Sequence, residues 1–299
     1  MDLEALRTFL AVVETGSIRA AADRRHRSQP ALSRQIKLFE EDLGARLFER
    51  AGRGLRLTAA GRQLRRDAAS ILHHVEEVSR RVREAAGAAR RSLVLGTSHH
   101  IALHRLPAPM REFRRRHTDV LLRVVYGGSE EIVEKVVSGE VDIGVVTLPS
   151  RRAGLVVRPA WEDRFVAALP IGHPLAALKQ VPLGRLSGEP LLLPQVGTTT
   201  RAAIESAFRK AKVPLGSVQE IPYLDTIRVS VEMGLGIAIL PETAVAEAAR
   251  GRRLAVRPLS GPPITRVLGI VHRKGAALSP VEETFVSILA RAGVSSPPD

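Results

Sequence analysis

A heptad repeat of apolar residues constrains the fold of this 299-residue chain more than any other feature of its sequence. The spacing alternates between four and three residues along Leu64, Ala68, Ile71, Val75, Val78, Val82, Ala85 and Ala89. This pattern predicts one helix from Thr58 to about Arg90, with a seam of about 40 Å. Such a seam favours a coiled coil with a second copy of the chain, and packing against the chain's own domain is the alternative. The helix divides the chain into three parts, 1–57, 58–91 and 92–299.

The part before this helix is predicted to form three shorter helices. Asp2 and Ser17 can cap the first two. Ser28 can cap the third, in which Pro30 occupies the first turn and Gly44 follows the end. The buried stripe of the third helix is expected to consist of Leu32, Ile36, Phe39 and Leu43.

The other face of the third helix is polar and can hydrogen-bond base edges and phosphates. A solvated surface face is the alternative interpretation. However, two short helices, a turn and a polar-faced third helix are typical of a helix-turn-helix, whose last helix enters the major groove of DNA. Segment 50–58 predicts a hairpin wing whose arginines would reach backbone phosphates. The candidate DNA contacts are Arg27, Ser28, Gln29, Pro30, Ser33, Arg34, Lys37, Arg50, Arg53 and Arg56.

The part after the long helix alternates short apolar runs with helical stretches. Strands are predicted over 92–96, 120–128, 140–147, 164–170, 190–194, 236–240 and 266–273, and helices over 103–117, 129–140 and 200–212. This alternation predicts an α/β fold with mostly parallel sheets, and its length suits two small lobes.

Charge and composition narrow the class of protein. The formal net charge is +14, which indicates a polyanionic partner such as nucleic acid. The absence of cysteine excludes disulfides and thiolate metal sites and fits a reducing cytosol. The chain begins with acidic residues rather than a basic signal-peptide region, and no apolar run approaches about 18 residues. The sequence therefore predicts a cytoplasmic, nucleoid-associated protein with no membrane segment.

Three segments resemble a LysR-type transcriptional regulator. They are residues 9–64, the sequence GHPLA at 172–176 and the sequence VEMGLGIAILP at 231–241. The resemblance implies a winged helix-turn-helix, a linker-helix dimer and a two-lobed effector domain of the periplasmic-binding-protein type. Lobe I would cover about 92–161 and 268–299, and lobe II about 162–267.

The same resemblance implies how such a protein works. A small-molecule inducer binds between the lobes and changes the angle of the DNA readers, and with it promoter bending and contact with RNA polymerase. The usual assembly is a tetramer of two dimers. Because a dimer places two recognition helices on one duplex, the operator should have dyad symmetry.

The chain departs from the family pattern in the turn before the recognition helix. Arg25 and Arg27 occupy positions where the family usually has apolar side chains. Because a buried unpaired arginine is costly, we expect both to reach solvent or phosphate and the local packing to be weaker.

Polar clusters follow three predicted strands, at places where an α/β fold binds its ligand. The candidate effector-binding residues are Thr97, Ser98, His99, His100, Thr147, Thr198 and Thr199. Hydroxyls and free N–H groups at helix starts bind anions well, and ordinary helix caps are the alternative. Ser98, His100, Thr147 and Thr199 also resemble the anion-binding positions of the sulfur-regulating branch of the family. That resemblance implies a small anionic inducer such as sulfate or a related sulfur compound.

Metal binding and catalysis were the competing hypotheses for these polar residues. His100 and His104 stand one helical turn apart, but no acidic residue is near them in sequence, so no metal or other cofactor is expected. Ser98 with histidines and acids could support hydrolysis, yet the sequence lacks the G-x-S-x-G, P-loop and H-E-x-x-H motifs. A transport solute-binding protein would need a signal peptide. We therefore expect a ligand-responsive transcription regulator and not an enzyme.

Overall fold

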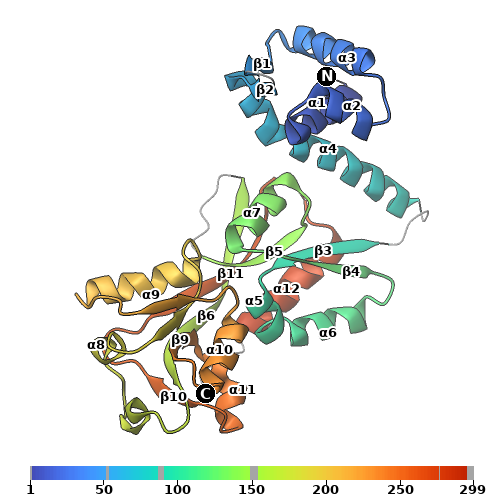
Figure 1. Ribbon diagram of the computed structural model, residues 1–299. Helices are drawn as coiled ribbons and strands as arrows, with labels where there is room; N and C mark the ends of the chain where they lie inside the picture. The colour runs from blue at the N-terminus through green and yellow to red at the C-terminus, as the bar shows by residue number, and fades with distance from the viewer. Residues whose placement is uncertain (1, 52–53, 87–90, 149–153, 276, 295–299) are drawn as a thin grey trace. The chain divides into compact units, whose positions relative to one another are not determined.

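The computed structural model describes residues 2–51, 54–86, 91–148, 154–275 and 277–294 (Figure 1). Arg53 and Ala89, both singled out in the sequence, lie outside these ranges. The chain forms two compact units, residues 1–90 and, apart from 138–140, residues 91–299. Within the described residues, no helix is both long and apolar enough to cross a membrane.

The first unit is a winged helix-turn-helix followed by a long helix. Its elements are α1 (Leu3–Thr15), α2 (Ile18–Arg24), α3 (Gln29–Leu43), β1 (Phe48–Ala51), β2 (Gly54–Leu57) and α4 (Ala59–Ala85). The Asp2 carboxylate accepts hydrogen bonds from two backbone N–H groups of α1, and the Ser28 hydroxyl accepts one from Ala31. Gly16 and Gly44 end α1 and α3 in the left-handed conformation, which glycine adopts without steric cost. The caps predicted at Asp2 and Ser28 therefore form, whereas Ser17 precedes α2 without a side-chain hydrogen bond to it.

The core of this unit is built by α1 to α3, and α4 closes it. Leu6 and Phe9 of α1 are fully buried, and the Phe9 ring lies 5.3 Å from that of Phe48 at the start of the wing. Ala68 of α4 is also fully buried here, with Leu64 and Ile71 packed beside it. The small Ala68 side chain lets α4 approach the head closely.

This packing divides the heptad seam into two halves with different roles. Leu64, Ala68 and Ile71 pack on the chain's own head, which is the alternative that the heptad pattern left open for this part of the seam. Val78 and Val82 are 49% and 63% exposed. Val78 and Val82, in the second half, are thus open to a partner.

The second unit is a mixed α/β structure. Its strands are β3 (Ser92–Thr97), β4 (Leu121–Tyr126), β5 (Ile143–Thr147), β6 (Leu155–Leu169), β7 (Leu191–Leu193), β8 (Val218–Glu220), β9 (Ile237–Pro241), β10 (Ala255–Pro258) and β11 (Thr265–Arg273). Its helices are α5 (His99–His104), α6 (Pro107–Arg116), α7 (Ser129–Ser138), η1 (Pro174–Ala177), α8 (Leu183–Leu186), α9 (Thr199–Lys210), α10 (Leu224–Glu232), α11 (Glu242–Arg250) and α12 (Pro280–Val294). The strand order is β4-β3-β5-β11-β6-β9-β7-β8, and β10 pairs with β6.

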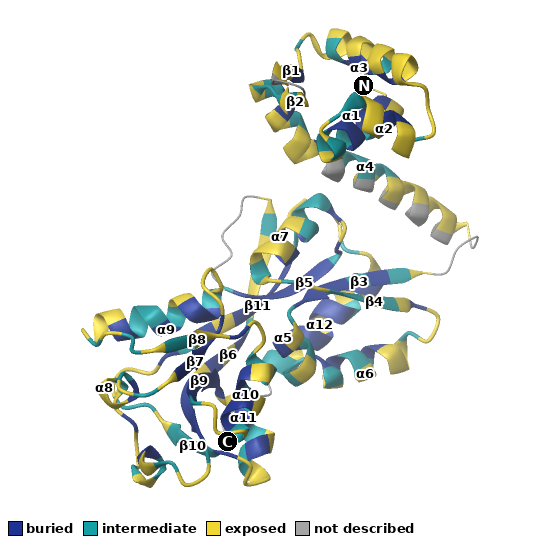
Figure 2. Cartoon of the chain, in the orientation of Figure 1, coloured by how far each residue is buried: buried dark blue, intermediate teal, exposed yellow. Residues whose placement is uncertain are grey.

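Two strands, β6 and β11, connect two lobes. β6 pairs with β11 as far as Arg164, and from Phe165 onwards it pairs with β9 and β10. Lobe I is built on β3 to β5 around Phe113 and Phe285, and lobe II on β7 to β9 around a separate apolar core. Figure 2 shows β5, β7 and β9 as buried strands, with exposed residues on the outer faces of the helices.

The expectation of mostly parallel sheets is wrong for the connecting strands. β3 runs parallel to β4 and β5, and β7 runs parallel to β8 and β9. In contrast, β6 and β11 are antiparallel to all their partners. The reason is topological, because β6 takes the chain from lobe I to lobe II and β11 brings it back beside β6.

Candidate functional site

The recognition helix α3 presents one polar face to solvent. Its exposed side chains are Gln29, Pro30, Ser33, Arg34 and Lys37, opposite the buried Leu32, Ile36 and Phe39. Lys37 lies 3.7 Å from Glu41 one turn later, and both side chains are more than half exposed. Among the described residues, Arg34 makes no ion pair, so its guanidinium is available to a base or a phosphate.

The turn between α2 and α3 accommodates both unusual arginines. Arg25 forms an ion pair of 2.7 Å with Glu4 on α1, and its side chain is 25% exposed. Arg27 is exposed. Between them, His26 adopts a left-handed backbone conformation with φ of 52°, which is uncommon for a residue other than glycine. One arginine therefore finds a carboxylate and the other reaches solvent.

The wing is attached to the recognition helix through a residue that the sequence analysis missed. The Glu40 carboxylate, on α3, accepts hydrogen bonds from the backbone N–H groups of Leu47 and Phe48. On the wing itself, Arg50 is exposed, and Arg56 is paired with Glu49 on the opposite strand at 2.9 Å. Arg56 is still 72% exposed, so it remains accessible to a phosphate.

A cavity of about 500 Å³ lies in the second unit, where α5 and α7 of lobe I face α9 and α10 of lobe II. Six of the seven predicted effector residues line it, namely Ser98, His99, His100, Thr147, Thr198 and Thr199. Thr97 does not line it, because this residue is buried inside the sheet and its hydroxyl donates to the Val145 carbonyl at 3.0 Å.

Several of the cavity hydroxyls also have local structural roles. Ser98 and Thr198 accept hydrogen bonds from backbone N–H groups of α5 and α9 and so cap these helices. Thr198 also donates to the Gln195 carbonyl at 2.9 Å. Both are therefore helix caps that line a cavity, so the two interpretations of these residues are compatible.

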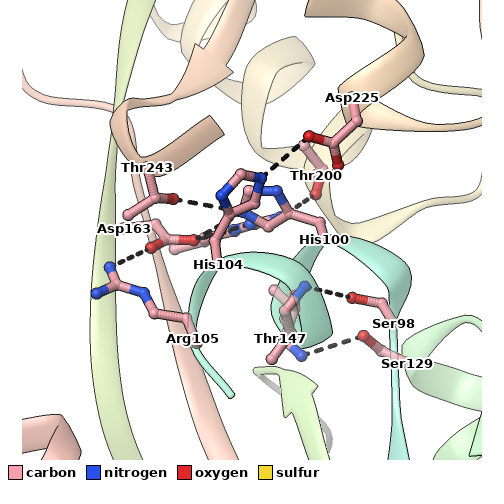
Figure 3. A network of polar contacts seen from close by, with 12 residues as sticks. Ser98, His100, His104, Arg105, Ser129, Thr147, Asp163, Thr200, Asp225 and Thr243 are labelled. Atoms are coloured by element: carbon pink, nitrogen blue, oxygen red, sulfur yellow. Dashed lines mark hydrogen bonds and ion pairs between the residues drawn. The ribbon is translucent and has the colours of Figure 1, made fainter. Parts of the chain in front are cut away.

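A buried ionic network at the base of the cavity was not foreseen from the sequence (Figure 3). Asp163 on β6 accepts hydrogen bonds from Arg105 at 2.6 Å and from Arg266 on β11 at 2.8 and 3.0 Å. Arg266 also donates to the Thr200 hydroxyl at 2.7 Å and lines the cavity. These residues are far apart in sequence, and no local pattern links them.

Burial and charge set the protonation states in this network. Burial lowers the pKa of His100 to about 4, although the neighbouring Asp163 carboxylate opposes this shift. Burial alone would raise the pKa of Asp163, but His100 and the two arginines outweigh it and hold that pKa well below its usual range. At neutral pH one carboxylate therefore faces two guanidinium groups and a neutral imidazole, which leaves one net positive charge.

Histidines of α5 connect the two lobes across the cavity. His104 lies 3.0 Å from the carboxylate of Asp225 on α10 (Figure 3). The exposed ring of His99 stacks on Tyr126 of lobe I at 4.8 Å and meets the edge of Tyr223 of lobe II at 4.9 Å. Asp225 supplies the acidic residue that is missing near His100 and His104 in the sequence. These three residues form the one group in the described part of the chain with the make-up and spacing of a metal site.

Comparison with known proteins agrees with this architecture. Residues 3–62 match the family of bacterial regulatory helix-turn-helix proteins of the lysR type, and residues 86–293 match the LysR substrate binding domain. The chain is 32% identical over 275 residues to a probable nitrogen assimilation transcriptional activator of Synechococcus elongatus, covering 91% of this chain and 88% of the relative. It is 31% identical over 284 residues to the regulator CysB of Burkholderia cenocepacia, covering 94% and 90%.

A solved structure extends the agreement to DNA binding. Full-length CbnR in complex with its target DNA is 25% identical, with a TM-score of 0.70 over 98% of this chain and 100% of that chain. The predicted fold, a winged helix-turn-helix head and a two-lobed α/β domain, is thus confirmed. The matched domains and relatives are those of transcriptional regulators and not of enzymes. The chain belongs to the LysR family of DNA-binding transcriptional regulators, with a substrate-binding domain that follows its DNA-binding head.

Proposed function

We propose that this regulator responds to a small anion bound in the cavity between the two lobes. The observation that carries the proposal is the positive charge at the base of the cavity. Asp163 neutralises only one of Arg105 and Arg266, and a guanidinium cannot lose its proton in a protein.

The Thr200 hydroxyl can link Arg266 to a bound ligand, because it accepts a hydrogen bond from Arg266 and can donate one to the ligand. Its oxygen accepts from Arg266, and among the described residues the hydroxyl proton has no acceptor. Thr199 precedes it in the first turn of α9, a 12-residue helix whose N-terminal dipole also favours an anion. An anion at this point would therefore meet hydroxyl donors in front of a buried cation.

The acidic residues that line the cavity oppose this charge only weakly. Glu131 pairs with Lys135 at 2.8 Å, and Asp225 pairs with His104. Glu130 is exposed, so water screens its charge. The cavity volume suits a small molecule. Sulfate and related sulfur compounds are the first ligands to test, because the polar pattern resembles that of the sulfur-regulating branch.

The response would reach DNA through a dimer. Val78 and Val82 form an exposed apolar strip on α4, which suits pairing with the same strip of a second chain. Such a pair carries two recognition helices, so we propose a dyad-symmetric operator, contacted by the exposed face of α3 and by the wing. A tetramer of two dimers and contact with RNA polymerase complete this proposal by analogy with the family.

Calorimetric titration of the full-length protein with sulfate, phosphate and small carboxylates tests the ligand class. We expect one anion to bind with saturation and its affinity to fall in Thr199→Ala and Thr200→Val. The matched control is Thr284→Ala, a partly exposed threonine of α12, outside the cavity, whose hydroxyl bonds only within its own helix. If no anion binds, or if the control loses as much affinity as the cavity variants, the proposal is wrong.

A further inference from the structure

Three potential metal ligands converge from opposite lobes. One nitrogen or oxygen atom from each of His100, His104 and Asp225 lies within 4.8 Å of the other two. The two histidines stand one turn apart on α5 in lobe I, and Asp225 lies in the first turn of α10 in lobe II. His104 Nε2 and the Asp225 carboxylate are already 3.0 Å apart.

This spacing is close to that of a zinc site. Zn²⁺ binds histidine nitrogen and carboxylate oxygen at about 2.0–2.2 Å, which puts neighbouring tetrahedral ligands about 3.3 Å apart. The His104–Asp225 pair meets this separation. The third ligand atom needs to move closer by about 1–1.5 Å, which is within the reach of side-chain rotation.

One ring nitrogen of His100 makes no hydrogen bond to the described residues. Its ring is only 5% exposed, and its Nδ1 atom has no hydrogen-bond partner among the described residues. Its other nitrogen, Nε2, lies 3.4 Å from the Thr243 hydroxyl and 3.8 Å from the Asp163 carboxylate. Metal-bound histidines have this arrangement, with one nitrogen held by a carboxylate or hydroxyl and the other free to bind the ion.

Charge does not oppose an ion here. Asp163 offsets one of the two nearby guanidinium groups, Arg105 and Arg266, and the ligand Asp225 itself supplies a negative charge for the cation. Asp163 lies between the two arginines and the imidazole of His100, so it partly offsets the cations nearest to the ligands.

We propose that His100, His104 and Asp225 bind a divalent transition-metal ion, Zn²⁺ fitting best, with a fourth position open to the cavity. Because two ligands come from lobe I and one from lobe II, the ion would tie α5 to α10 and hold the lobes together. Metal supply would then become a second input to the regulator. The site depends only on these three side chains and holds whatever the identity of the anionic ligand.

Titration of the full-length protein with the metal alone tests this inference. The protein is first dialysed against a chelator and then titrated with Zn²⁺ by calorimetry and with Co²⁺ by visible absorption, which reports tetrahedral coordination. We expect one ion per chain. Affinity should fall by about tenfold or more in His104→Gln and in Asp225→Asn, since even residues behind the ligands have effects of that size.

His99→Gln is the matched control, because His99 is on the same helix and lines the same cavity but is not in the ligand group. Metal affinity should be unchanged in this variant. A thermal melt of each protein checks the fold, and Zn²⁺ should raise the melting temperature of the wild type and of His99→Gln only. Absence of saturable binding to the wild type, or binding that survives in both ligand variants, would overturn the site.

Discussion

Asp163 and Arg266 are cross-strand partners on β6 and β11, joined by an ion pair of 2.8 Å where both strands pass from one lobe to the other. Arg105, which follows α5 of lobe I, and Thr200, on α9 of lobe II, bind to the same pair. The network therefore links the connecting strands to both lobes. A ligand that contacts Thr200 would therefore be linked to β11 through the hydrogen bond from Arg266 to Thr200.

Removing the charge of Asp163 should destabilise the second unit strongly. Asp163→Asn leaves Arg105 and Arg266 buried without a counter-charge, which typically costs about 3–5 kcal/mol. Trp161 is the single tryptophan of the chain and is 5% exposed in lobe I, so its fluorescence reports urea unfolding of this unit. Asp119→Asn, at an exposed position, should change stability by less than about 0.5 kcal/mol. Equal effects of the two variants would contradict a stabilising role of the network.

The free energy of unfolding of the second unit should fall as the solution is acidified. Because burial lowers the pKa of His100 from 6.5 to about 4, the unfolded chain binds a proton between these pH values that the folded chain does not. Stability is thus lost as the pH falls through this window, by at most about 3 kcal/mol. The lowered pKa of Asp163 acts in the same direction, but only as the pH falls below the usual range for a carboxyl group.

His100→Gln separates these two contributions. Urea unfolding followed by Trp161 fluorescence, in the presence of a chelator, should show a flatter pH profile for this variant between pH 6.5 and about 4. The steep loss at lower pH should remain, because Asp163 is still present. If the stability of the variant falls as steeply as that of the wild type between pH 6.5 and about 4, His100 is not the cause of that fall.

Dimerisation should depend on the exposed half of the heptad seam. Val82→Asp places a charge on the apolar strip without touching the packed half at Ala68, so we expect a folded monomer by sedimentation. Arg83→Asp introduces the same residue at the next position of α4, outside the seam, and should leave the dimer intact. If Val82→Asp stays dimeric, pairing through this strip is wrong.

Arginines of the head should separate into base-reading and phosphate-binding classes. Arg34 on α3 has no ion pair among the described residues, and Arg34→Ala should cost about 1–3 kcal/mol on the operator and relax preference at one base pair. Arg50 on the wing is predicted to contact phosphate, so Arg50→Ala should weaken all sequences alike and reduce the salt dependence of binding. Band-shift titrations on the operator and on a scrambled duplex at two salt concentrations distinguish these outcomes.

Local signals made much of this fold predictable. The caps at Asp2, Ser28 and Thr198 and the 4-3 spacing along α4 are properties of short segments, and each structure forms where its pattern lies. The missed elements lack such patterns. β8 and β10 have three and four residues, and Arg158 and Pro159 interrupt the apolar residues in the first half of β6.

The hydroxyl and histidine side chains that line the cavity could be predicted from the sequence, but the ionic network at its base could not, and the reason is topological. Ser98, His100, Thr147 and Thr199 lie at or after the ends of parallel strands, and the strand ends of both lobes face the cavity. Asp163 and Arg266 come instead from the antiparallel connecting strands, and Asp225 is 121 residues from His104. Their contacts depend on the pairing of distant segments, which local periodicity does not encode.

The two parts of the α4 seam, one packed on the head and one exposed, would let a rotation of this helix move the DNA-binding head. Ala68 packs on the DNA-reading head, and Val82, where we propose that a second chain pairs, lies about 20 Å further along the helix at 1.5 Å per residue. In a dimer crossing at Val82, a change of about 10° in the crossing angle would move one head relative to the other by about 3.5 Å, close to the rise of one base pair. A small rotation at this crossing would thus be enough to shift a recognition helix from one base pair to the next.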